Sequence, residues 1–371
     1  MSVLIICEKP SVAKTVALAL GAAEQKDGYF SGDGLLVSWC IGHLISMADA
    51  GSYDERYKKW RYEDLPILPQ TWKYAPTPGK EKQLAVLKEL LHRSDVSEVV
   101  NGCDAGREGE LIFRFVYEQA GCTKPFSRLW ISSMEDSAIR EGFAGRRAGT
   151  EYDALYQSAL CRARADWLVG INATRLFSVL YHKTLNVGRV LSPTLNLLVE
   201  RDGKITMFHK EKYHIVHIGC GGVDAESERI SDAAAADALK TACEASQAVC
   251  VSLKKEKKTA LPPKLFDLTL LQREANRVYG FTAKQTLDYA QSLYEKRFLT
   301  YPRTDSNYLT EDMAQTATDL VAALLPVLPF MQGAELTPEI GRVINSAKVS
   351  DHHAIIPTAA FAGNGFDGLP E

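Results

Sequence analysis

The chain has 371 residues, of which 46% are hydrophobic and 24% are charged, and its formal net charge is −3. This length exceeds one ordinary core, so we expect about two to four domains of a soluble globular protein. No apolar run of about 18 residues occurs, which argues against a membrane-spanning helix, and a net charge near zero does not by itself indicate a nucleic-acid-binding protein.

The N-terminal residues and the cysteines suggest a compartment. Residues 1–10 lack a basic leader region and reach a charge early, so they predict a buried first strand rather than a signal peptide. The 8 cysteines form no C-x-x-C pair, and Cys7 and Cys103 lie in apolar runs. We therefore expect reduced core thiols in a cytoplasmic protein, and not disulfides or a zinc site.

Residues 1–150 alternate apolar runs of strand length with segments of helical periodicity. The runs lie at 3–7, 35–40, 96–103 and 127–131, and the helical segments begin near Pro10 and continue at 80–92, 107–119 and 134–143. Strands that alternate with helices are typical of a parallel sheet with helices on its faces. We expect a Rossmann-like α/β domain here.

Residues 152–325 are mostly helical, with one part that contains strands. We expect helices at 159–181, 193–200 and 232–245, strands at 213–218 and 248–253, and further helices over 266–325. Pro262-Pro263 indicates a boundary, and Leu299–Pro302 interrupts the last helical part.

Basic residues outnumber acidic ones between Arg162 and Arg201 and again between Lys254 and Arg297. A basic stripe on a near-neutral protein is compatible with a DNA groove. Solvated helix faces explain the same charges equally well, so both interpretations stay open on charge alone.

Three carboxylates follow the predicted strands. Glu8 comes after the first strand, Asp104 after the strand at 96–103, and Glu108 lies in the first turn of the next helix. Sites in open parallel sheets form beyond the carboxyl ends of the strands, so these side chains can meet. Clustered carboxylates suit Mg²⁺, and one of them can instead stay protonated as a general acid. Alternatively, Glu108 stabilises a helix N-terminus and Asp104 forms a turn.

The segment Thr300-Tyr301-Pro302-Arg303-Thr304-Asp305-Ser306 carries a second candidate site. Pro302 ends any preceding helix, so Tyr301 is expected on an extended or loop segment, and Arg303 can neutralise a phosphate. A lone Tyr-Pro pair is usually structural. The chain holds no G-x-x-x-x-G-K-[ST] phosphate loop, so we expect no nucleotide cofactor.

Three motifs together resemble the type IA DNA topoisomerases, in particular the topoisomerase III branch. They are Cys7-Glu8-Lys9-Pro10-Ser11 with Cys103–Glu110, which resemble the Toprim domain; the Tyr301 segment, which resembles the active-site motif T-Y-P-R-T-D-S; and Asp351-His352-His353-Ala354-Ile355-Ile356-Pro357-Thr358. The motifs follow the family's order over nearly the whole chain. The family usually shows D-x-D-x-E, and here Gly106 replaces the second Asp, which puts metal affinity in question.

The resemblance implies roles for individual residues. Tyr301 is expected to be the nucleophile that forms a 5′-phosphotyrosine intermediate without ATP. Lys9 and Arg303 are expected to contact the phosphate, together with His352, for which His353 is the alternative. Glu8 is expected to act as general acid to the leaving 3′ oxygen. Mg²⁺ is expected on Asp104, Glu108 and Glu8, either with more water or with help from Glu110.

The resemblance also implies a path for single-stranded DNA. Residues 162–175 are similar to a helix of domain IV, and residues 188–195 are similar to the turn G-R-V-Q-[ST]-P-T-L, with Leu191 in place of Gln. The expected DNA-binding residues are Arg162, Arg164, Arg175, Arg189, Asp305 and Ser306. The partners are expected to be single-stranded DNA, DNA with single-stranded regions and a helicase, in the bacterial cytoplasm at the nucleoid.

The expected architecture is a Toprim domain at 1–150, first parts of domains IV and II at 151–210 and 211–265, and most of domain III at 266–371. The family's return segments, which complete domains II and IV, are missing after Glu371, so we expect an N-terminal fragment or a shortened protein. The expected function is ATP-independent DNA relaxation or decatenation. The alternatives are a truncated relative that binds single-stranded DNA without strand passage, and a Toprim nuclease or primase.

Overall fold

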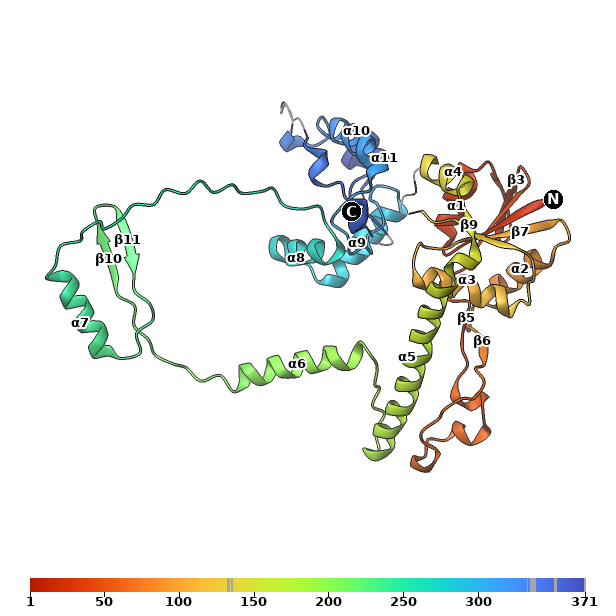
Figure 1. Cartoon of the computed structure of the whole chain (residues 1–371), viewed down its shortest axis with the longest axis horizontal. Coiled ribbons are helices and arrows are strands. Elements are labelled where there is room, and N and C mark those ends of the chain that lie inside the picture. Colours follow the sequence, from red (N-terminus) through yellow and green to blue (C-terminus); the bar gives the residue numbers. More distant parts are fainter. Residues whose placement is uncertain (132–133, 135, 332, 334–337, 350–351, 370–371) are drawn as a thin grey trace. The chain divides into compact units, whose positions relative to one another are not determined.

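The computed structural model describes residues 1–131, 134, 136–331, 333, 338–349 and 352–369. Asp351 and Glu371, which were named above, lie outside the described residues, as does residue 135 of the helical segment predicted at 134–143. The chain forms two compact units, one of Met1–Gly188 with Pro263–Glu371 and one of Arg189–Pro262 (Figure 1).

A seven-stranded sheet organises the N-terminal part of the first unit. Its order is β2-β3-β4-β1-β7-β8-β9. The strands are β1 (Ser2–Cys7), β2 (Glu24–Lys26), β3 (Tyr29–Gly32), β4 (Leu35–Trp39), β7 (Val96–Gly102), β8 (Phe126–Arg128) and β9 (Arg147–Ala148). The central strands β4, β1, β7 and β8 are parallel, and the edge pairs are antiparallel. The expected parallel sheet is thus confirmed at its centre and wrong at its edges, because short antiparallel hairpins complete it.

Helices cover both faces of this sheet, as the alternation of side chains in β1 requires. They are α1 (Pro10–Ala19), α2 (Glu81–His92), α3 (Arg107–Gln119), α4 (Asp136–Ala144) and α5 (Asp153–Leu180). Leu4 and Ile6 pack in a cluster with α2, α3 and the start of α5, whereas Ile5 and Cys7 pack with α1 and α4.

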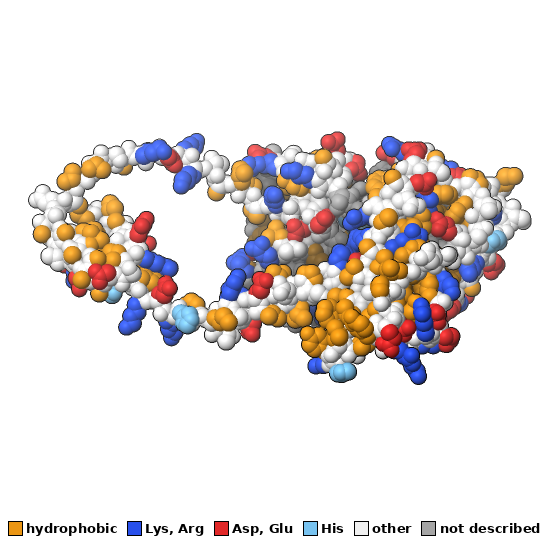
Figure 2. Space-filling model, turned by 60° about the horizontal axis from the view of Figure 1, so that its bottom comes forward, with side chains coloured by type: hydrophobic (Ala, Val, Ile, Leu, Met, Phe, Trp, Pro, Cys, Tyr) orange, Lys and Arg blue, Asp and Glu red, His pale blue; other side chains and the backbone are white. Residues whose placement is uncertain are grey.

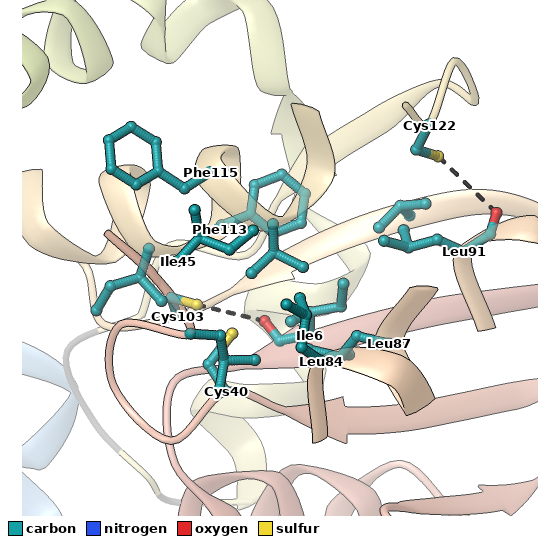
Figure 3. Packing of buried hydrophobic residues seen from close by; sticks show 14 of the residues in the cluster. Ile6, Cys40, Ile45, Leu84, Leu87, Leu91, Cys103, Phe113, Phe115 and Cys122 are labelled. Atoms are coloured by element: carbon teal, nitrogen blue, oxygen red, sulfur yellow. Dashed lines mark hydrogen bonds between the residues drawn. The ribbon is translucent and has the colours of Figure 1, made fainter. Parts of the chain in front are cut away.

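Buried thiols are part of the first cluster (Figure 3). The Cys103 thiol contacts the carbonyl oxygen of Ile6 at 3.6 Å, and the Cys122 thiol contacts that of Leu91 at 3.9 Å. All cysteines are free, and Cys7, Cys40, Cys103 and Cys122 are buried. The expectation that Cys7 and Cys103 lie in the core is therefore confirmed.

The long helix α5 extends beyond the sheet and packs along the loop that contains the short hairpin β5 (Ile45–Met47) and β6 (Tyr74–Pro76). Asn172 accepts from the amide of Ile67 at 2.6 Å and donates to its carbonyl at 3.0 Å, and Trp167 donates to the carbonyl of Ala48 at 3.0 Å. The far end of α5 exposes hydrophobic side chains, among them Leu180 and Tyr181 (Figure 2).

Residues 263–369 form a smaller layer with its own core. Its helices are α8 (Leu268–Tyr279), α9 (Ala283–Glu295), α10 (Ala314–Leu324) and α11 (Ala359–Asn364). Asp267 caps α8, and Thr282 with Gln285 forms a capping box on α9. A cluster that includes Leu309, Leu320 and Ile356 fills the interior.

The second unit holds α6 (Leu191–Thr206), the hairpin β10 (His217–Cys220) and β11 (Val223–Glu226), and α7 (Ala233–Glu244). Gly221 and Gly222 turn the hairpin with φ of +57° and +80°, as a two-residue turn of this kind requires. No residue of α6 is buried. The strand predicted at 248–253 is wrong: Val251 and Leu253 are 92% and 90% exposed, because no strand of the described chain pairs with this segment.

Among the described residues, no helix combines the length and the apolar character needed to cross a bilayer.

Candidate active site

Lys9 lies at the centre of the candidate site. It is the N-cap of α1, with Pro10 directly after it, so β1 delivers its side chain to the carboxyl end of the sheet. Its ammonium donates to Asp104 Oδ2 at 2.9 Å and to Tyr301 Oη at 3.2 Å. Glu8 Oε1 lies 3.5 Å from the same nitrogen. One cation therefore joins two carboxylates and a phenol.

The loop after β7 holds Asp104 rigidly. Gly109 in α3 approaches so closely that a Cβ there would lie 2.1 Å from the carbonyl oxygen of Asp104. From the other side, the buried Arg128 donates to the carbonyls of Cys103 and Asp104 at 2.7 and 2.6 Å. The backbone of this loop is thus held by contacts that do not involve its own side chains.

The Tyr301 segment is extended and pairs with the histidine segment. Leu299 forms a bridge with Pro357, and Phe266 forms one with Ile355. Thr304 adds a hydrogen bond to the carbonyl of His352 at 2.8 Å. Because of this pairing, two motifs that are far apart in the sequence reach Asp104 together.

The ring of Tyr301 is enclosed on several sides. Lys9 Nζ lies 4.4 Å from its centroid, and the His352 and Tyr294 rings lie 4.3 and 5.3 Å from it, centroid to centroid. His352 Nε2 is 3.3 Å from Asp104 Oδ2. His353, the alternative, is instead buried with its Nδ1 against the carbonyl of Ala354, so the geometry favours His352 as the residue at the site.

Burial and neighbouring charges shift the pKa values of Glu8 and Asp104 in opposite directions. Burial raises the pKa of Glu8, the negative charge of Asp104 adds to this rise, and Lys9 counteracts it. Burial also acts to raise the pKa of Asp104, but contacts with His352 and Lys9 outweigh it and bring that pKa to about 2. Burial acts to lower the pKa of Lys9, and the two carboxylates nevertheless hold it above its usual value. The pKa values of these two neighbouring carboxylates are therefore shifted in opposite directions.

Comparison with known proteins identifies the family. A family model described as DNA topoisomerase matches residues 150–366, more than half of the chain, and a Toprim domain model matches residues 3–134. The chain belongs to the DNA topoisomerase family. The predicted type IA family is confirmed.

Two curated relatives of this chain carry the name DNA topoisomerase 3. The protein from Shouchella clausii is 41% identical over 95% of this chain, and that from Bacillus subtilis is 41% identical over 96%. The solved topoisomerase I of Thermotoga maritima matches 98% of this chain with a TM-score of 0.63 at 25% identity, and 57% of its own chain is covered. The chain spans about half the length of the curated relatives it matches.

The carboxylates expected to bind Mg²⁺ are only partly together in this chain. Glu8 and Asp104 share Lys9, whereas Glu108 is half exposed and lies 3.4 Å from Arg162 and 3.5 Å from His43. No group of three His, Cys, Asp or Glu in the described chain is arranged to hold a metal ion. The carboxylate oxygens are the hard donors that Mg²⁺ prefers, so these residues fit the ion chemically.

Glu110, the suggested additional ligand, has a different function. Its carboxylate is 1% exposed and lies 2.9 Å from Arg128 and 3.3 Å from Arg114, with a further hydrogen bond from Asn101 at 2.8 Å. A carboxylate enclosed in this way is not available to a metal, so the suggestion that Glu110 helps to bind Mg²⁺ is corrected: Glu110 forms a buried ion pair with Arg128 and Arg114.

The three arginines of α5 differ in accessibility. Arg162 is partly exposed near Glu108, and Arg164 lies against the Tyr74 hydroxyl and the Trp72 ring. Arg175 is 4% exposed and donates to the carbonyl of Tyr57 at 2.7 Å. Its position therefore indicates that it fastens the loop 48–72 to α5 and does not contact DNA.

The residues after Tyr301 alternate between exposed and buried, as an extended strand does. Arg303 and Asp305 are exposed, whereas Ser306 is buried and donates to the carbonyl of Lys348 at 2.9 Å. Arg189 belongs to the other unit, where it is exposed. Ser306 is thus a residue that shapes the segment.

Three residues near the site escaped sequence reasoning. His43 contacts Glu108, Tyr294 borders Tyr301, and Arg128 supports Asp104. The first two lie in segments without a distinctive pattern. Arg128 lies in the strand predicted at 127–131, and only its complete burial reveals that it has a partner.

Proposed function

We propose that this chain breaks and rejoins single-stranded DNA through Tyr301. The observation that carries the proposal is the position of the Tyr301 hydroxyl, 3.2 Å from the Lys9 ammonium and beside Asp104 and His352. A phosphate bound there has a nucleophile and two candidate cations around it, which is the arrangement needed to stabilise developing charge.

The proposed cleavage step balances its bonds and protons. Tyr301 Oη forms a bond to phosphorus while the bond from phosphorus to the 3′ oxygen breaks. The phenol gives its proton to solvent water, and Glu8, whose pKa is raised by burial, gives one to the leaving 3′ oxygen. The 5′-phosphotyrosine link conserves the energy of the broken bond, so rejoining reverses these steps without a nucleotide.

Mg²⁺ is proposed as the metal, with Asp104, Glu108 and Glu8 as the residues that would hold it. When bound, it supplies positive charge next to a phosphate oxygen. The Toprim match supports this assignment.

Single-stranded DNA, or DNA with single-stranded regions, is the proposed partner. Arg162, Arg164, Arg303, Asp305 and Arg189 are the proposed contacts, and the buried Arg175 and Ser306 are proposed to hold the backbone in shape. Relaxation or decatenation, a helicase partner, independence of nucleotides and a place at the bacterial nucleoid extend the same proposal to the whole protein.

The second candidate is a protein that binds single-stranded DNA without passing a strand. Gly106 favours it, because one expected metal ligand is missing. The second unit favours it too, because α6 has no buried residue.

A covalent trap separates the two functions. The chain is incubated with Mg²⁺ and an oligonucleotide labelled at its 3′ end, and the mixture is then denatured. The first function predicts a labelled protein adduct, because the 5′ phosphate of the 3′ fragment stays on Tyr301. Tyr301→Phe should abolish the adduct, whereas Tyr308→Phe, a tyrosine in the same segment that contacts Lys348, should retain it. Salt-dependent binding without any adduct would establish the second function instead.

A further inference from the structure

The two carboxylate oxygens of Glu108 each have a partner, an arginine for one and a histidine for the other. Arg162 Nη1 lies 3.4 Å from Oε1, and His43 Nε2 lies 3.5 Å from Oε2. Arg162 comes from α5 and His43 from the loop before β5. Lys80 fixes that loop by donating to the carbonyls of Ile41 and His43. Glu108 is therefore held at the side of the site, although it lies in the first turn of the helix that follows Asp104.

These contacts are of a kind that can exchange. The side chains of Glu108, Arg162 and His43 are 52%, 35% and 40% exposed, and both distances exceed those of a strong ionic hydrogen bond. Exposed ion pairs contribute little to stability. Glu110, two residues further along α3, is the contrasting case, because its carboxylate and Arg128 are 1% and 0% exposed.

Side chains also compensate the charge of Asp104. Its Oδ2 is contacted by Lys9 and by His352, so its charge is also compensated by side chains. Gly106 offers no carboxylate between Asp104 and Glu108. A metal ion held by all three proposed carboxylates therefore requires Glu108 to leave Arg162 and His43, while Glu8 and Asp104 already share Lys9.

We propose that single-stranded DNA and the metal ion bind cooperatively through an exchange of partners, in which a DNA phosphate takes Arg162 and Glu108 turns from Arg162 toward Asp104. The inference rests on the proposed function and adds a positioning role for Arg162 and His43. In the free chain these two residues hold Glu108 away from Asp104. With DNA bound, Arg162 compensates a phosphate, and the Glu108 carboxylate becomes available to a cation.

The exchange predicts that DNA and the metal ion increase each other's affinity for the chain. DNA must raise metal affinity, and the metal must raise DNA affinity by the same factor, since coupling between two ligands is mutual. Couplings of this type usually amount to about 5–150-fold. Weakening the hold on Glu108 must raise metal affinity in the absence of DNA and reduce the effect of DNA.

The test measures Mn²⁺ binding, as a probe for Mg²⁺, from the electron paramagnetic resonance signal of the free ion. Every protein carries Tyr301→Phe, so that no strand is cut, and is measured alone and with a saturating oligonucleotide. The same titration with Glu108→Gln added subtracts the metal that DNA itself binds. With Glu108 intact, DNA should tighten Mn²⁺ binding by about 5-fold or more.

Three further variants identify the residues involved. Arg162→Gln and His43→Ala should each bind Mn²⁺ more tightly than the parent without DNA and respond less to DNA. Arg162→Lys, which keeps the charge, should restore much of the response. Arg93→Ala, which removes an exposed ion pair with Asp95, should behave like the parent.

Two results overturn the exchange. One is equal Mn²⁺ affinity of the parent with and without DNA, and the other is weaker DNA-free binding in Arg162→Gln. The covalent trap is read separately: an adduct without coupling refutes the exchange alone, and coupling without an adduct refutes the proposed cleavage alone.

Discussion

At Lys9, one ammonium group contacts oxygen atoms that come from three parts of the chain. Glu8 is its neighbour, Asp104 ends another strand, and Tyr301 belongs to the C-terminal layer. The ammonium also lies 4.4 Å from the centre of the Tyr301 ring. A free Lys9 side chain would leave two partly buried carboxylates uncompensated, so this residue stabilises the site as well as preparing it for a phosphate.

Asp104 makes the folding stability of the chain depend on pH, with higher stability when its carboxyl group is ionised. Its pKa is about 2 in the folded chain and about 3.9 in an unfolded one, so folding is stabilised by its ionised form. The stabilisation is fully present above pH ~4 and is lost as the pH falls toward ~2. Asp104→Asn should cost about 2 kcal/mol at pH 7, and the difference from the parent should vanish near pH 2, as measured by denaturant unfolding over this range.

Asp95 is the matched control for Asp104. Its pKa is also lowered to about 2, by Arg93, but the pair lies on the surface. Solvent screens such a pair, so Asp95→Asn should change stability much less. Equal losses in both variants would show that burial of Asp104 does not matter.

At the scale of the element, the start of α3 determines where Asp104 lies. Gly106 is the N-cap of α3, and the close approach of Gly109 leaves no space for a side chain against the Asp104 carbonyl. The start of α3 therefore limits where the loop that contains Asp104 can lie, and Arg128 supports that loop from the sheet.

Gly109→Ala should displace this loop. Its Cβ would lie 2.1 Å from the Asp104 oxygen, so backbone must move, and overpacking of this kind costs about 1–3 kcal/mol. Adduct formation should fall together with the midpoint of thermal unfolding. Gly203→Ala in α6 meets no atom within 4 Å and should not lower that midpoint, because alanine favours helix over glycine. An unchanged unfolding midpoint for Gly109→Ala would contradict the proposal that close packing of α3 fixes the position of the Asp104 loop.

Periodicity in the sequence predicted most elements of the sheet domain, because their apolar faces are buried. The same reasoning failed for residues 248–253, whose alternating pattern describes a strand without a partner. It also missed the antiparallel edges of the sheet, since hairpin strands as short as β2 and β9 carry little pattern.

At the scale of the whole molecule, motif order predicted which residues assemble but not how their charges are paired. Tyr301, Lys9, Asp104 and His352 meet as expected. Tertiary packing, which motif spacing does not encode, decides whether Arg175 and Ser306 are exposed. It also decides that Glu108 lies beside Arg162. The resemblance names a function for each residue, whereas burial decides whether the residue can perform it.

The two units differ in how well they bury their side chains, and this difference predicts where the folded chain opens. Residues 247–262 have neither helix nor strand, and Lys254, Lys255, Lys257 and Lys258 are exposed there. Exposed segments without regular secondary structure are the first to be cut by proteases. Brief digestion with a lysine-specific protease should therefore cleave first among these four lysines.

Intact-mass analysis of the first fragments checks this prediction. Replacing the four lysines by glutamine should remove the early cleavage without changing the thermal midpoint, because their side chains contribute little to packing. Early cleavage at Lys58 or Lys59 instead would mean that the loop 48–72 opens more readily than the extended segment. The hydrogen bonds of Asn172, Trp167 and Arg175 to this loop argue against that outcome, since all three anchor it to α5 along much of its length.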